Sequence, residues 1–549
     1  MKVTEAIAKA LADLGADTMF GVVGSGNFHL TNALISHGVR YVAARHECGA
    51  ASMADAWARL AGRPALLTLH QGPGLTNALT GITEAAKSRT PLLVLAADVS
   101  ASAVTSNFRI DVAAIASGTG ATAARLHSAA FALDDAVRAY RTARDERRTV
   151  VLGLPLDVQA GECSWPGSPD LRPAEPVTPS QPQAAALAAV LADARRPVFV
   201  AGRGARSAAA RAALERLADS CGALLATSAA AKGLFRGSPW DLDVSGGFAS
   251  PLAAELIAGA DVLVAWGCSL NMWTTRHGTL IGEQTTVVQV DDDPSALGRH
   301  RPVHLGVAGD VALTAAAVAD LLEHLLGQHD TGYRSAELKA GLAARRRWRD
   351  VPYDDEGDGD RIDPRTLTIA LDDLLPAERI VAIDSGNFMG YPSMFLSVPD
   401  QDGFCFTQAY QSIGLGLASA IGSAVARPDR LVVAALGDGG ALMGISELET
   451  AVRLQLPMVI VIYDDEAYGA EVHHFGPDGH PLDTVRFPPA DLAAIARGFG
   501  CDAVTVRTAG DLGPVRDWLA ARPARPIVID AKVTSDHGAW WLEEAFRGH

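Results

Sequence analysis

Short apolar runs alternate with helix-like amphipathic segments along this chain, and the alternation constrains its fold more than any other feature. Parallel strands need a crossover connection, usually a helix, so this pattern is typical of parallel α/β sheets. The runs fall into three blocks, and we therefore predict three α/β domains, each a doubly wound parallel sheet. The predicted strands are residues 18–23, 41–45, 65–70 and 91–98 in the first block, 196–202, 223–228, 260–267 and 286–293 in the second, and 379–384, 431–436, 458–463 and 526–533 in the third.

Two segments separate these blocks. Residues 161–183 are rich in proline, which cannot continue a helix or a central strand. Residues 345–364 are strongly charged and end in Asp363-Pro364, a pair typical of a helix start. We therefore predict domains at residues 1–165, 184–328 and 361–549.

The charge balance excludes some classes of partner. The 549 residues are 48% hydrophobic and carry a formal net charge of -16. Nucleic acids and anionic membranes need clustered Lys and Arg, so we expect neither as a partner. The six cysteines are scattered without a CxxC pair, which suits a reducing compartment. No apolar run approaches the ~20 residues of a membrane span, so we expect a cytoplasmic protein.

One strand–helix–strand unit of the third block carries carboxylates at both ends. Residues 431–436 read as a buried strand, 437–440 as a tight turn and 445–455 as a helix, and a second apolar strand follows. Because the two strands are parallel, Asp438 and Asp465 fall on the same edge of the sheet, where open α/β sheets bind ligands. Oxygen ligands beside glycines suit a magnesium ion that bridges to phosphates. The alternative is that these carboxylates only cap loop ends.

The Gly-Asp-Gly of residues 437–439, followed by Asp465, resembles the fingerprint of enzymes that use thiamin diphosphate (ThDP). The family resembled is that of acetolactate synthase, pyruvate decarboxylase and benzoylformate decarboxylase, and the resemblance covers essentially the whole chain. It implies, in this order, a pyrimidine-binding domain, a middle Rossmann-like domain and a diphosphate-binding domain, with ThDP and Mg²⁺ as cofactors. The family usually has Asn-Asn where this chain has Asp464-Asp465, so the metal site carries extra negative charge.

The resemblance also implies which residues hold the cofactors. The metal ligands are Asp438, Asp465 and Ala467. The other cofactor contacts implied are Gly386, Asn387, Gln411, Ile413, Gly437, Gly439, Gly440 and Tyr468. Ile413 takes the place of a bulky apolar residue that bends the cofactor, and the carbonyl of Gln411 accepts from its 4′-amino group. The residues alone leave Ile413 open to interpretation as an ordinary core side chain.

Glu47 follows a predicted strand and begins a predicted helix. A glutamate there ordinarily only complements the helix dipole, for a few tenths of a kcal/mol. In the family resembled, the glutamate at this place hydrogen-bonds N1′ of the aminopyrimidine and activates the cofactor. The resemblance further implies that the Glu47 and Asp438 serving one cofactor come from different subunits, so we expect a homodimer or homotetramer.

Four further residues are candidates for the chemistry. His70 matches a catalytic histidine of benzoylformate decarboxylase, and an imidazole titrates near neutral pH. Ser25 matches a substrate-contacting serine of that enzyme, and His29 resembles a histidine of benzaldehyde-lyase-like enzymes. Glu471 follows Tyr468 at the spacing of the proton-relay glutamate of pyruvate decarboxylase. The alternatives are a structural strand end for His70 and a surface loop for Ser25 and His29.

A phenylalanine–glutamine pair of biosynthetic acetolactate synthases is replaced here by Phe108-Arg109. This departure weakens, without excluding, the interpretation that the chain makes acetolactate for biosynthesis. Arg109 could bind a substrate carboxylate as a bidentate fork, or it could pair with Asp111.

These assignments predict an enzyme that decarboxylates a 2-oxo acid, and that either releases an aldehyde or joins the remaining fragment to a second carbonyl compound. Two alternatives stay open: an FAD-containing enzyme of the oxidase type with the same fold, and a non-catalytic homologue that binds the cofactor for regulation. The Gly202-x-Gly204 turn of the second block is only a weak sign of dinucleotide binding.

Overall fold

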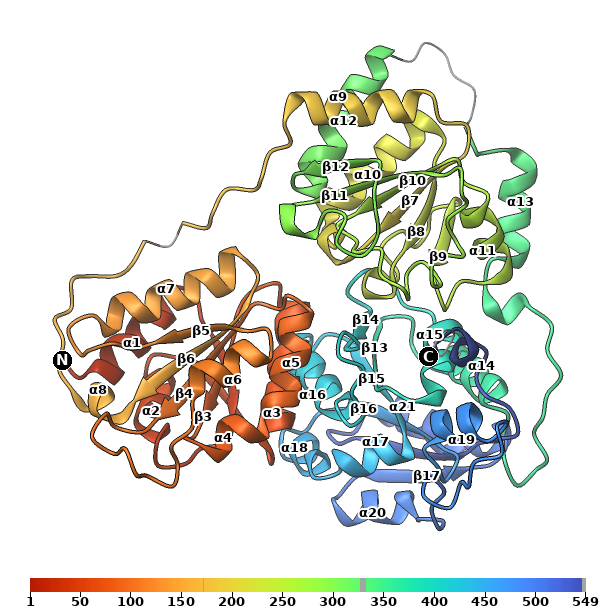
Figure 1. The fold of residues 1–549 in the computed structure, drawn as a ribbon. Helices are drawn as coiled ribbons and strands as arrows, with labels where there is room; N and C mark the ends of the chain where they lie inside the picture. Colours follow the sequence, from red (N-terminus) through yellow and green to blue (C-terminus); the bar gives the residue numbers. More distant parts are fainter. Residues whose placement is uncertain (171, 326–331, 546–549) are drawn as a thin grey trace.

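The computed structural model describes residues 1–170, 172–325 and 332–545 and contains three six-stranded sheets in which all paired strands run parallel. Helices flank each sheet (Figure 1). The prediction of three parallel α/β units is thereby confirmed. The predicted domain limit at residue 328 and the predicted end at residue 549 lie outside the described residues.

The first sheet has the order β2-β1-β3-β4-β6-β5. Its strands are β1 (Thr18–Gly21), β2 (Arg40–Ala43), β3 (Ala65–Leu69), β4 (Leu92–Asp98), β5 (Thr122–Arg125) and β6 (Thr149–Pro155). The helices around it are α1 (Val3–Asp13), α2 (Phe28–Ser36), α3 (Glu47–Ala61), α4 (Pro73–Asn77), α5 (Leu79–Lys87), α6 (Val112–Gly118), α7 (Ala132–Asp145) and α8 (Leu156–Ala160).

The middle sheet has the order β12-β11-β10-β7-β8-β9. Its strands are β7 (Pro197–Ala201), β8 (Leu224–Thr227), β9 (Asp241–Val244), β10 (Val262–Trp266), β11 (Thr286–Asp291) and β12 (Leu305–Ala308). The helices of this part of the chain are α9 (Gln181–Ala192), α10 (Ala208–Cys221), α11 (Pro251–Ala258), α12 (Val311–Leu325) and α13 (Ala336–Arg345). This strand order is that of dinucleotide-binding folds.

The third sheet has the order β14-β13-β15-β16-β18-β17, which repeats the order of the first sheet. Its strands are β13 (Arg379–Ile383), β14 (Phe404–Phe406), β15 (Leu431–Gly437), β16 (Met458–Asp464), β17 (Asp502–Val506) and β18 (Ile527–Lys532). Its helices are α14 (Pro364–Leu374), α15 (Gly390–Phe395), α16 (Gly416–Ala426), α17 (Asp438–Met443), α18 (Glu447–Arg453), α19 (Gly469–Phe475), α20 (Leu492–Gly498), α21 (Gly513–Ala521) and α22 (Trp540–Ala545). As predicted, Asp363 caps α14, with its carboxylate accepting from the backbone N–H of Arg365.

Every predicted strand is present, and six further strands complete the sheets. Five of these six, β5, β9, β12, β14 and β17, lie at sheet edges. Edge strands bury less of their surface, so their apolar pattern is weaker; β5 alternates between half-buried and exposed residues. The sixth, β6, is fully buried inside the first sheet, and its apolar run was a signal that the prediction overlooked.

The turn predicted at residues 437–440 is instead the start of a helix. Helix α17 begins at Asp438 directly after β15, and the next helix, predicted at residues 445–455, is the shorter α18. The predicted turn was wrong because these glycines do not reverse the chain. They let the backbone of α17 approach Asp384 closely, and a Cβ at residue 440 would lie 2.4 Å from Oδ2 of Asp384. The strand–helix–strand order itself is as predicted.

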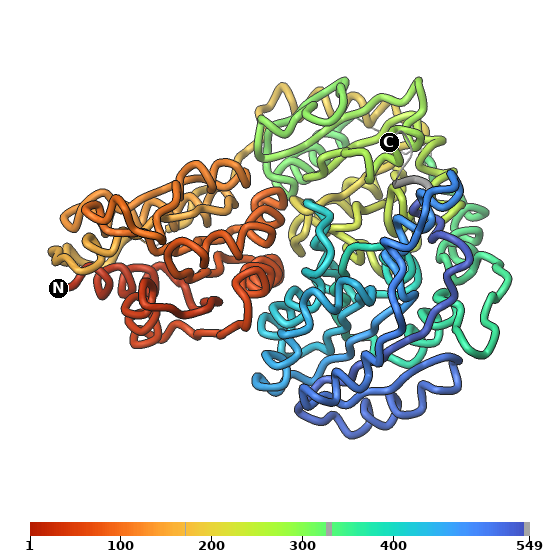
Figure 2. Tube along the Cα trace, turned by 60° about the horizontal axis from the view of Figure 1, so that its bottom comes forward, coloured from red at the N-terminus to blue at the C-terminus, as the bar shows by residue number. Residues whose placement is uncertain are grey.

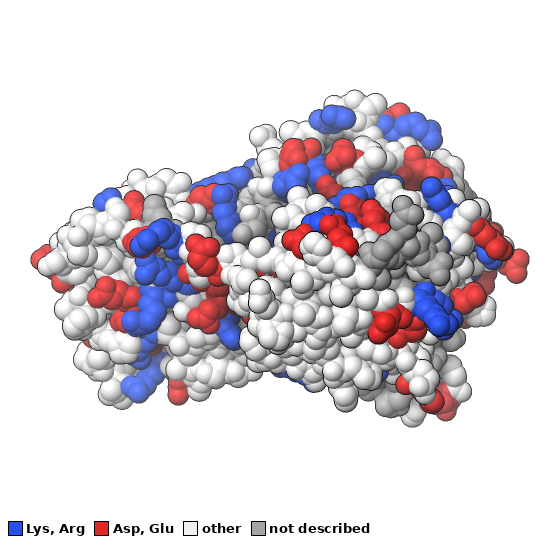
Figure 3. All heavy atoms as spheres, turned by 90° about the horizontal axis from the view of Figure 1, so that it is seen from above, with Lys and Arg blue, Asp and Glu red and all other residues white. Residues whose placement is uncertain are grey.

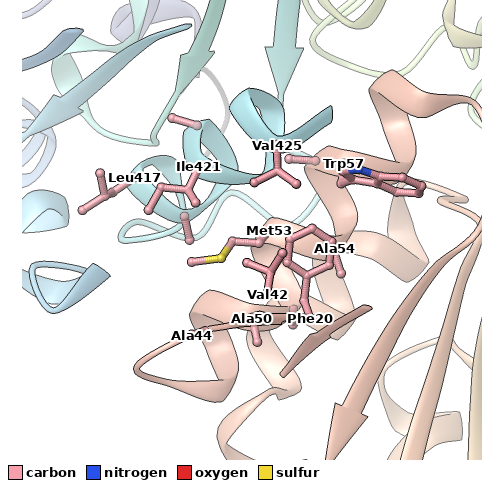
Figure 4. Close-up of a cluster of buried hydrophobic side chains, with 14 of the residues drawn as sticks. Phe20, Val42, Ala44, Ala50, Met53, Ala54, Trp57, Leu417, Ile421 and Val425 are labelled. Atoms are coloured by element: carbon pink, nitrogen blue, oxygen red, sulfur yellow. The ribbon is translucent and has the colours of Figure 1, made fainter. Parts of the chain in front are cut away.

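The first and third domains meet along helices α3 and α16, which pack against each other (Figure 4). Met53 and Trp57 of α3 face Leu417, Ile421 and Val425 of α16 in one buried cluster. The backbones touch at Gly422, where a Cβ would lie 2.2 Å from the carbonyl oxygen of Met53. Burial of this continuous apolar seam fixes the two domains relative to each other.

The C-terminal helix α22 lies against the middle domain, as Figure 2 shows for the blue end of the chain beside the green segment. The Arg276 guanidinium stands 4.6 Å from the ring centre of Trp540. The ring of Trp541 packs 5.9 Å from Trp273 and 6.3 Å from Phe248. Helix α22 is thus anchored by aromatic contacts at the boundary between the third and middle domains.

Acidic and basic side chains are interspersed on the face of the molecule shown in Figure 3. Within the residues that the structure describes, no helix combines the length and the apolar character that a membrane crossing requires.

Candidate active site

A cleft of about 2440 Å³ opens where the three domains meet, at the carboxyl ends of the third sheet. In this sheet β13 has β14 as its neighbour on one side and β15 on the other, so the strand order reverses between β13 and β15. Open α/β sheets bind ligands at such a switch point. The structure brings twelve of the predicted site residues together in the cleft lining. They are Gly386, Asn387, Gln411, Ile413, Gly437, Asp438, Gly439, Gly440, Asp465, Ala467, Tyr468 and Glu471.

Two carboxyl groups, that of the buried Asp438 and that of the half-buried Asp465, line the same cleft. The backbone N–H of Ala467 lies against both of them, which places the three predicted metal ligands side by side. Burial and the nearby charge of Asp464 raise the pKa of Asp438 to about 7. Burial and the charges of Asp438 and Asp464 raise the pKa of Asp465 well above its usual range. Both carboxyl groups are therefore held in a place that lacks positive charge.

The acidic neighbours of Asp465 are each neutralised by a cation. Asp464 pairs with the buried ammonium of Lys532, which also lies 3.1 Å from Asp530. Glu466 pairs with the Arg361 guanidinium at 2.8 Å. Across the described residues, no Lys or Arg pairs with Asp465 or Asp438. These two carboxyl groups are therefore free to bind a cation. Two carboxylates with a backbone carbonyl nearby suit Mg²⁺, which completes its shell with phosphate and water oxygens.

Replacing Lys532 by methionine is expected to destabilise the fold by about 3–5 kcal/mol, because it leaves two buried carboxylates without a counter-charge. Urea unfolding followed by circular dichroism measures the loss. The second replacement Asp464→Asn should restore part of it by removing one of the unpaired charges. Equal stability of Lys532→Met and the wild type would contradict the assigned ion pair.

A third buried carboxylate, Asp384, organises the loops around the cleft. It is 1% exposed and accepts from the backbone N–H groups of Ser385 and Gly414 at 2.9 Å and of Leu415 at 3.3 Å. Burial raises its pKa to about 6. Asp384 thus joins the segment after β13 to the loop before α16. Sequence reasoning missed this role, although a carboxylate that directly follows a buried strand at the switch point was a usable signal.

The loop before α16 carries two predicted cofactor contacts, Gln411 and Ile413. Gln411 has a φ of +57°, which is unusual for a residue with a side chain and needs support from its surroundings. Asn387, on the opposite wall, is held by the C-terminal segment: its Oδ1 accepts from the N–H of Ala539, and its carbonyl accepts from Nε1 of Trp541, both at 2.9 Å. Both walls of the cleft are therefore fixed by hydrogen bonds from other parts of the chain.

The other predicted catalytic residues lie outside this cleft. Within the described residues, Glu47, His70, Ser25 and His29 all belong to the first domain, and none lines the cleft of their own chain. They follow the neighbouring strands β2, β3 and β1, so they share the carboxyl edge of the first sheet. Glu47 opens helix α3, is half-buried, and accepts from Nδ2 of Asn77 at 3.1 Å.

His70 is oriented by the loop that carries Ser25. The backbone N–H of Gly26 donates to Nδ1 of His70 at 3.1 Å, so the neutral ring carries its proton on Nε2. The ring also packs edge-on against Phe108, at 5.3 Å between centres. Ser25 and His29 are both exposed, but His29 lies in the first turn of α2 and not in the loop predicted for it. The geometry thus places a half-buried imidazole, with its N–H on Nε2, at the edge of the first sheet.

Arg109 and Glu471 are both exposed. Asp111 caps helix α6 through the N–H of Ala114. No ion pair joins Arg109 to Asp111 in the described chain, so the structure favours a guanidinium that is free to meet a ligand.

Comparison with known proteins covers most of the chain. Residues 1–122 match the family model described as "Thiamine pyrophosphate enzyme, N-terminal TPP binding domain", residues 184–318 match its central domain, and residues 384–531 match its C-terminal TPP binding domain. Thiamine pyrophosphate (TPP) is another name for ThDP.

Three curated relatives illustrate the range of proteins to which the chain is similar. The "Probable 2-ketoarginine decarboxylase AruI" of Pseudomonas aeruginosa is 31% identical, over 94% of this chain and 91% of that protein. The sulfoacetaldehyde acetyltransferase of Castellaniella defragrans is 27% identical, over 94% and 90%. The acetolactate synthase isozyme 2 large subunit of Escherichia coli is 28% identical, over 84% and 83%.

Proposed function

The chain belongs to the thiamine pyrophosphate enzyme family, and from that premise we propose that it is a ThDP- and Mg²⁺-dependent 2-oxo acid decarboxylase or carboligase. One observation supports the proposal: the carboxyl groups of Asp438 and Asp465, which pair with no Lys or Arg among the described residues, lie together at the switch point of the third sheet. Such a pair can bind a divalent cation, and a cation there would anchor a diphosphate.

The residues of the cleft fit this cofactor. Asp438, Asp465 and the carbonyl of Ala467 would hold Mg²⁺, with Gly386, Asn387 and the glycines of 437–440 around the diphosphate. Gln411 and Ile413 would contact the ring system from the loop before α16. When bound, ThDP supplies the carbon nucleophile and electron sink that decarboxylation of a 2-oxo acid requires.

The placement of Glu47 supports a dimeric enzyme. Glu47 lies outside the cleft of its own chain, at the carboxyl edge of the first sheet. If Glu47 activates a cofactor, that cofactor is held by a second subunit. Each chain would then activate the cofactor that the other chain holds. A homodimer or a homotetramer built from such dimers meets this requirement.

Proton handling is assigned to the half-buried His70 and the exposed Glu471, at the edges of the first and third sheets. His70, with its proton on Nε2, would donate to or accept from the reacting substrate, and Ser25 of the adjacent loop and His29 of the first turn of α2 would contact the substrate. Glu471 lines the opposite wall, in the first turn of α19. All six cysteines are free thiols, which supports the proposal of a cytoplasmic enzyme.

The direct test is to incubate the purified protein with ThDP, Mg²⁺ and a panel of 2-oxo acids, and to separate aldehyde from acyloin products. Release of CO₂ from at least one member, dependent on both cofactors, supports the proposal. Absence of CO₂ release from every member would favour a non-catalytic, cofactor-binding role.

A second candidate function is the FAD-containing oxidase type, because the Gly202-x-Gly204 turn of the middle domain lines the same cleft. A flavin absorption band in the purified protein would decide for it.

Replacing His70 by alanine is expected to change how the product is released more than how the cofactor binds. We expect at least ~10²-fold slower aldehyde formation with ThDP affinity within a few-fold of wild type, because His70 would act on the substrate proton. Product analysis by chromatography, together with ThDP titration, checks both parts. An unchanged rate and an unchanged ratio of aldehyde to acyloin would remove His70 from the mechanism.

A further inference from the structure

Two buried glutamates, one from the first domain and one from the third, each accept hydrogen bonds from the backbone of the other domain. Glu447, on α18 of the third domain, accepts from the backbone N–H groups of Arg45 and His46 at 3.1 and 3.0 Å. Glu84, on α5 of the first domain, accepts from the backbone N–H groups of Ala409 and Tyr410 at 3.1 and 2.7 Å. The two carboxylates are 2% and 1% exposed. Each one therefore binds two successive N–H groups of the other domain.

The two contacts are equivalent in topology. The first and third sheets have the same strand order, and α5 and α18 each follow the third strand of their sheet, counted along the chain. The loops that they hold each follow the second strand, β2 or β14, and lead into α3 or α16. These are the helices that pack against each other in Figure 4. The pair of contacts thus obeys an approximate two-fold relation around the α3–α16 seam.

Each clamped loop presents residues that would act on a cofactor. The N–H groups bound by Glu447 belong to the two residues directly before Glu47. Those bound by Glu84 belong to the two residues directly before Gln411, whose backbone has a φ of +57°. A buried carboxylate that accepts two N–H groups fixes its loop more firmly than neutral contacts do, because hydrogen bonds to a charged acceptor are stronger.

We infer that Glu447 and Glu84 are reciprocal positioning residues: Glu447 sets the placement of Glu47, and Glu84 sets that of Gln411 and Ile413. This inference rests on the proposed function of those three residues. Each domain therefore holds in place the activating loop of the other. Because Glu47 would serve the partner's cofactor whereas Gln411 and Ile413 serve the cofactor in the chain's own cleft, one seam aligns parts of two active sites.

The local surroundings decide which variant tests the inference more cleanly. Glu84 also binds the Arg59 guanidinium at 2.8 Å, and Arg59 pairs with the buried Asp55. Substitution of Glu84 therefore disturbs a larger network. Glu447 has a simpler environment, in which Thr450 donates to its second oxygen at 2.6 Å. The matched control is Glu449→Gln, because Glu449 lies on the same helix but, in the described chain, pairs only with the side chains of Arg453 and Arg45, at 3.1 and 3.5 Å, and not with the loop backbone.

The first measurement is hydrogen exchange of the protein without cofactor. In Glu447→Gln, the amides of Arg45 and His46 should exchange at least ~10-fold faster than in wild type, because an amide oxygen is a weaker acceptor than a carboxylate. In Glu449→Gln they should exchange as in wild type. Faster exchange in both variants would show that the loop is held by α18 in general and would overturn the role of Glu447.

The second measurement follows deuterium exchange at the thiazolium C2 of bound ThDP by NMR, with turnover of a 2-oxo acid recorded in parallel. For Glu447→Gln we expect exchange ~10–100-fold slower than wild type, because small misplacements of an activating group cost about this much. The ThDP dissociation constant should stay within about threefold, since the diphosphate contacts are untouched. Wild-type C2 exchange in a variant whose loop amides are deprotected would overturn the inference.

Failure of the proposed function gives a different result. If wild-type protein neither binds ThDP nor accelerates C2 exchange over free ThDP, the function is wrong whatever Glu447 does. If Glu447→Gln does not fold, the same two measurements are made on Thr450→Val. This variant removes the hydrogen bond that orients the Glu447 carboxylate. Unchanged C2 exchange in Thr450→Val, with loosened loop amides, would again count against the inference.

Discussion

Replacement of Glu47 by glutamine is expected to lower turnover by at least ~10³-fold while leaving the fold intact. The amide has the shape of the carboxyl group, so the hydrogen bond from Asn77 can remain. A glutamine, however, cannot hold or release a proton at this position. Steady-state CO₂ release with saturating ThDP and Mg²⁺ measures the effect, and thermal unfolding tests the fold. Glu5→Gln, at a half-buried glutamate of α1 in the same domain that pairs with His37, serves as the control.

The opposite result would be informative. A Glu47→Gln protein that turns over at near the wild-type rate would show that this residue is only a helix N-terminal charge. The assignment of the activating group would then have to move elsewhere on the edge of the first sheet.

Replacement of Asp438 by alanine is expected to weaken ThDP binding by at least ~100-fold and to abolish its dependence on Mg²⁺. The reason is that it removes one of two carboxylates that lack a counter-cation in the described chain. Isothermal titration with ThDP, with and without Mg²⁺, checks this. Asp465→Asn is the matched variant, because an amide oxygen can still bind the metal and the family resembled usually has asparagine there.

The matched variant should keep Mg²⁺-dependent ThDP binding within about tenfold of wild type. It should also make the cofactor-free protein more stable, because it removes one of two neighbouring like charges. Tight, Mg²⁺-independent binding of ThDP by Asp438→Ala would contradict the metal site.

The sequence was informative wherever a function depends on local pattern. Asp438 and Asp465 could be placed on one edge from the strand–helix–strand order alone, and the cleft does contain both. The two linkers could be recognised from proline and charge. The α/β class followed from buried strands, whose continuous apolar runs are strong signals, whereas the edge strands β9 and β14 gave weak ones.

The parts that sequence reasoning missed depend on contacts between distant segments. Glu447 and Arg45 lie 402 positions apart, and Glu84 and Ala409 lie 325 apart. A glutamate in a helical pattern reads as a solvated face, and nothing local shows that its carboxylate is buried against another domain. The same holds for Lys532: its partner Asp464 ends a neighbouring strand, and only the sheet order β16-β18 brings them together.

The close approach at Gly422 has a consequence for how much variation the enzyme can tolerate. With the backbone of α16 against the carbonyl oxygen of Met53, no methyl group fits between the helices. At this point the two helices touch through backbone atoms, so no side chain can move aside to make room. Any added atom must therefore push one domain away from the other. A single methyl at residue 422, itself buried in the seam, would shift the first and third domains against each other, and with them the loops that lead into α3 and α16.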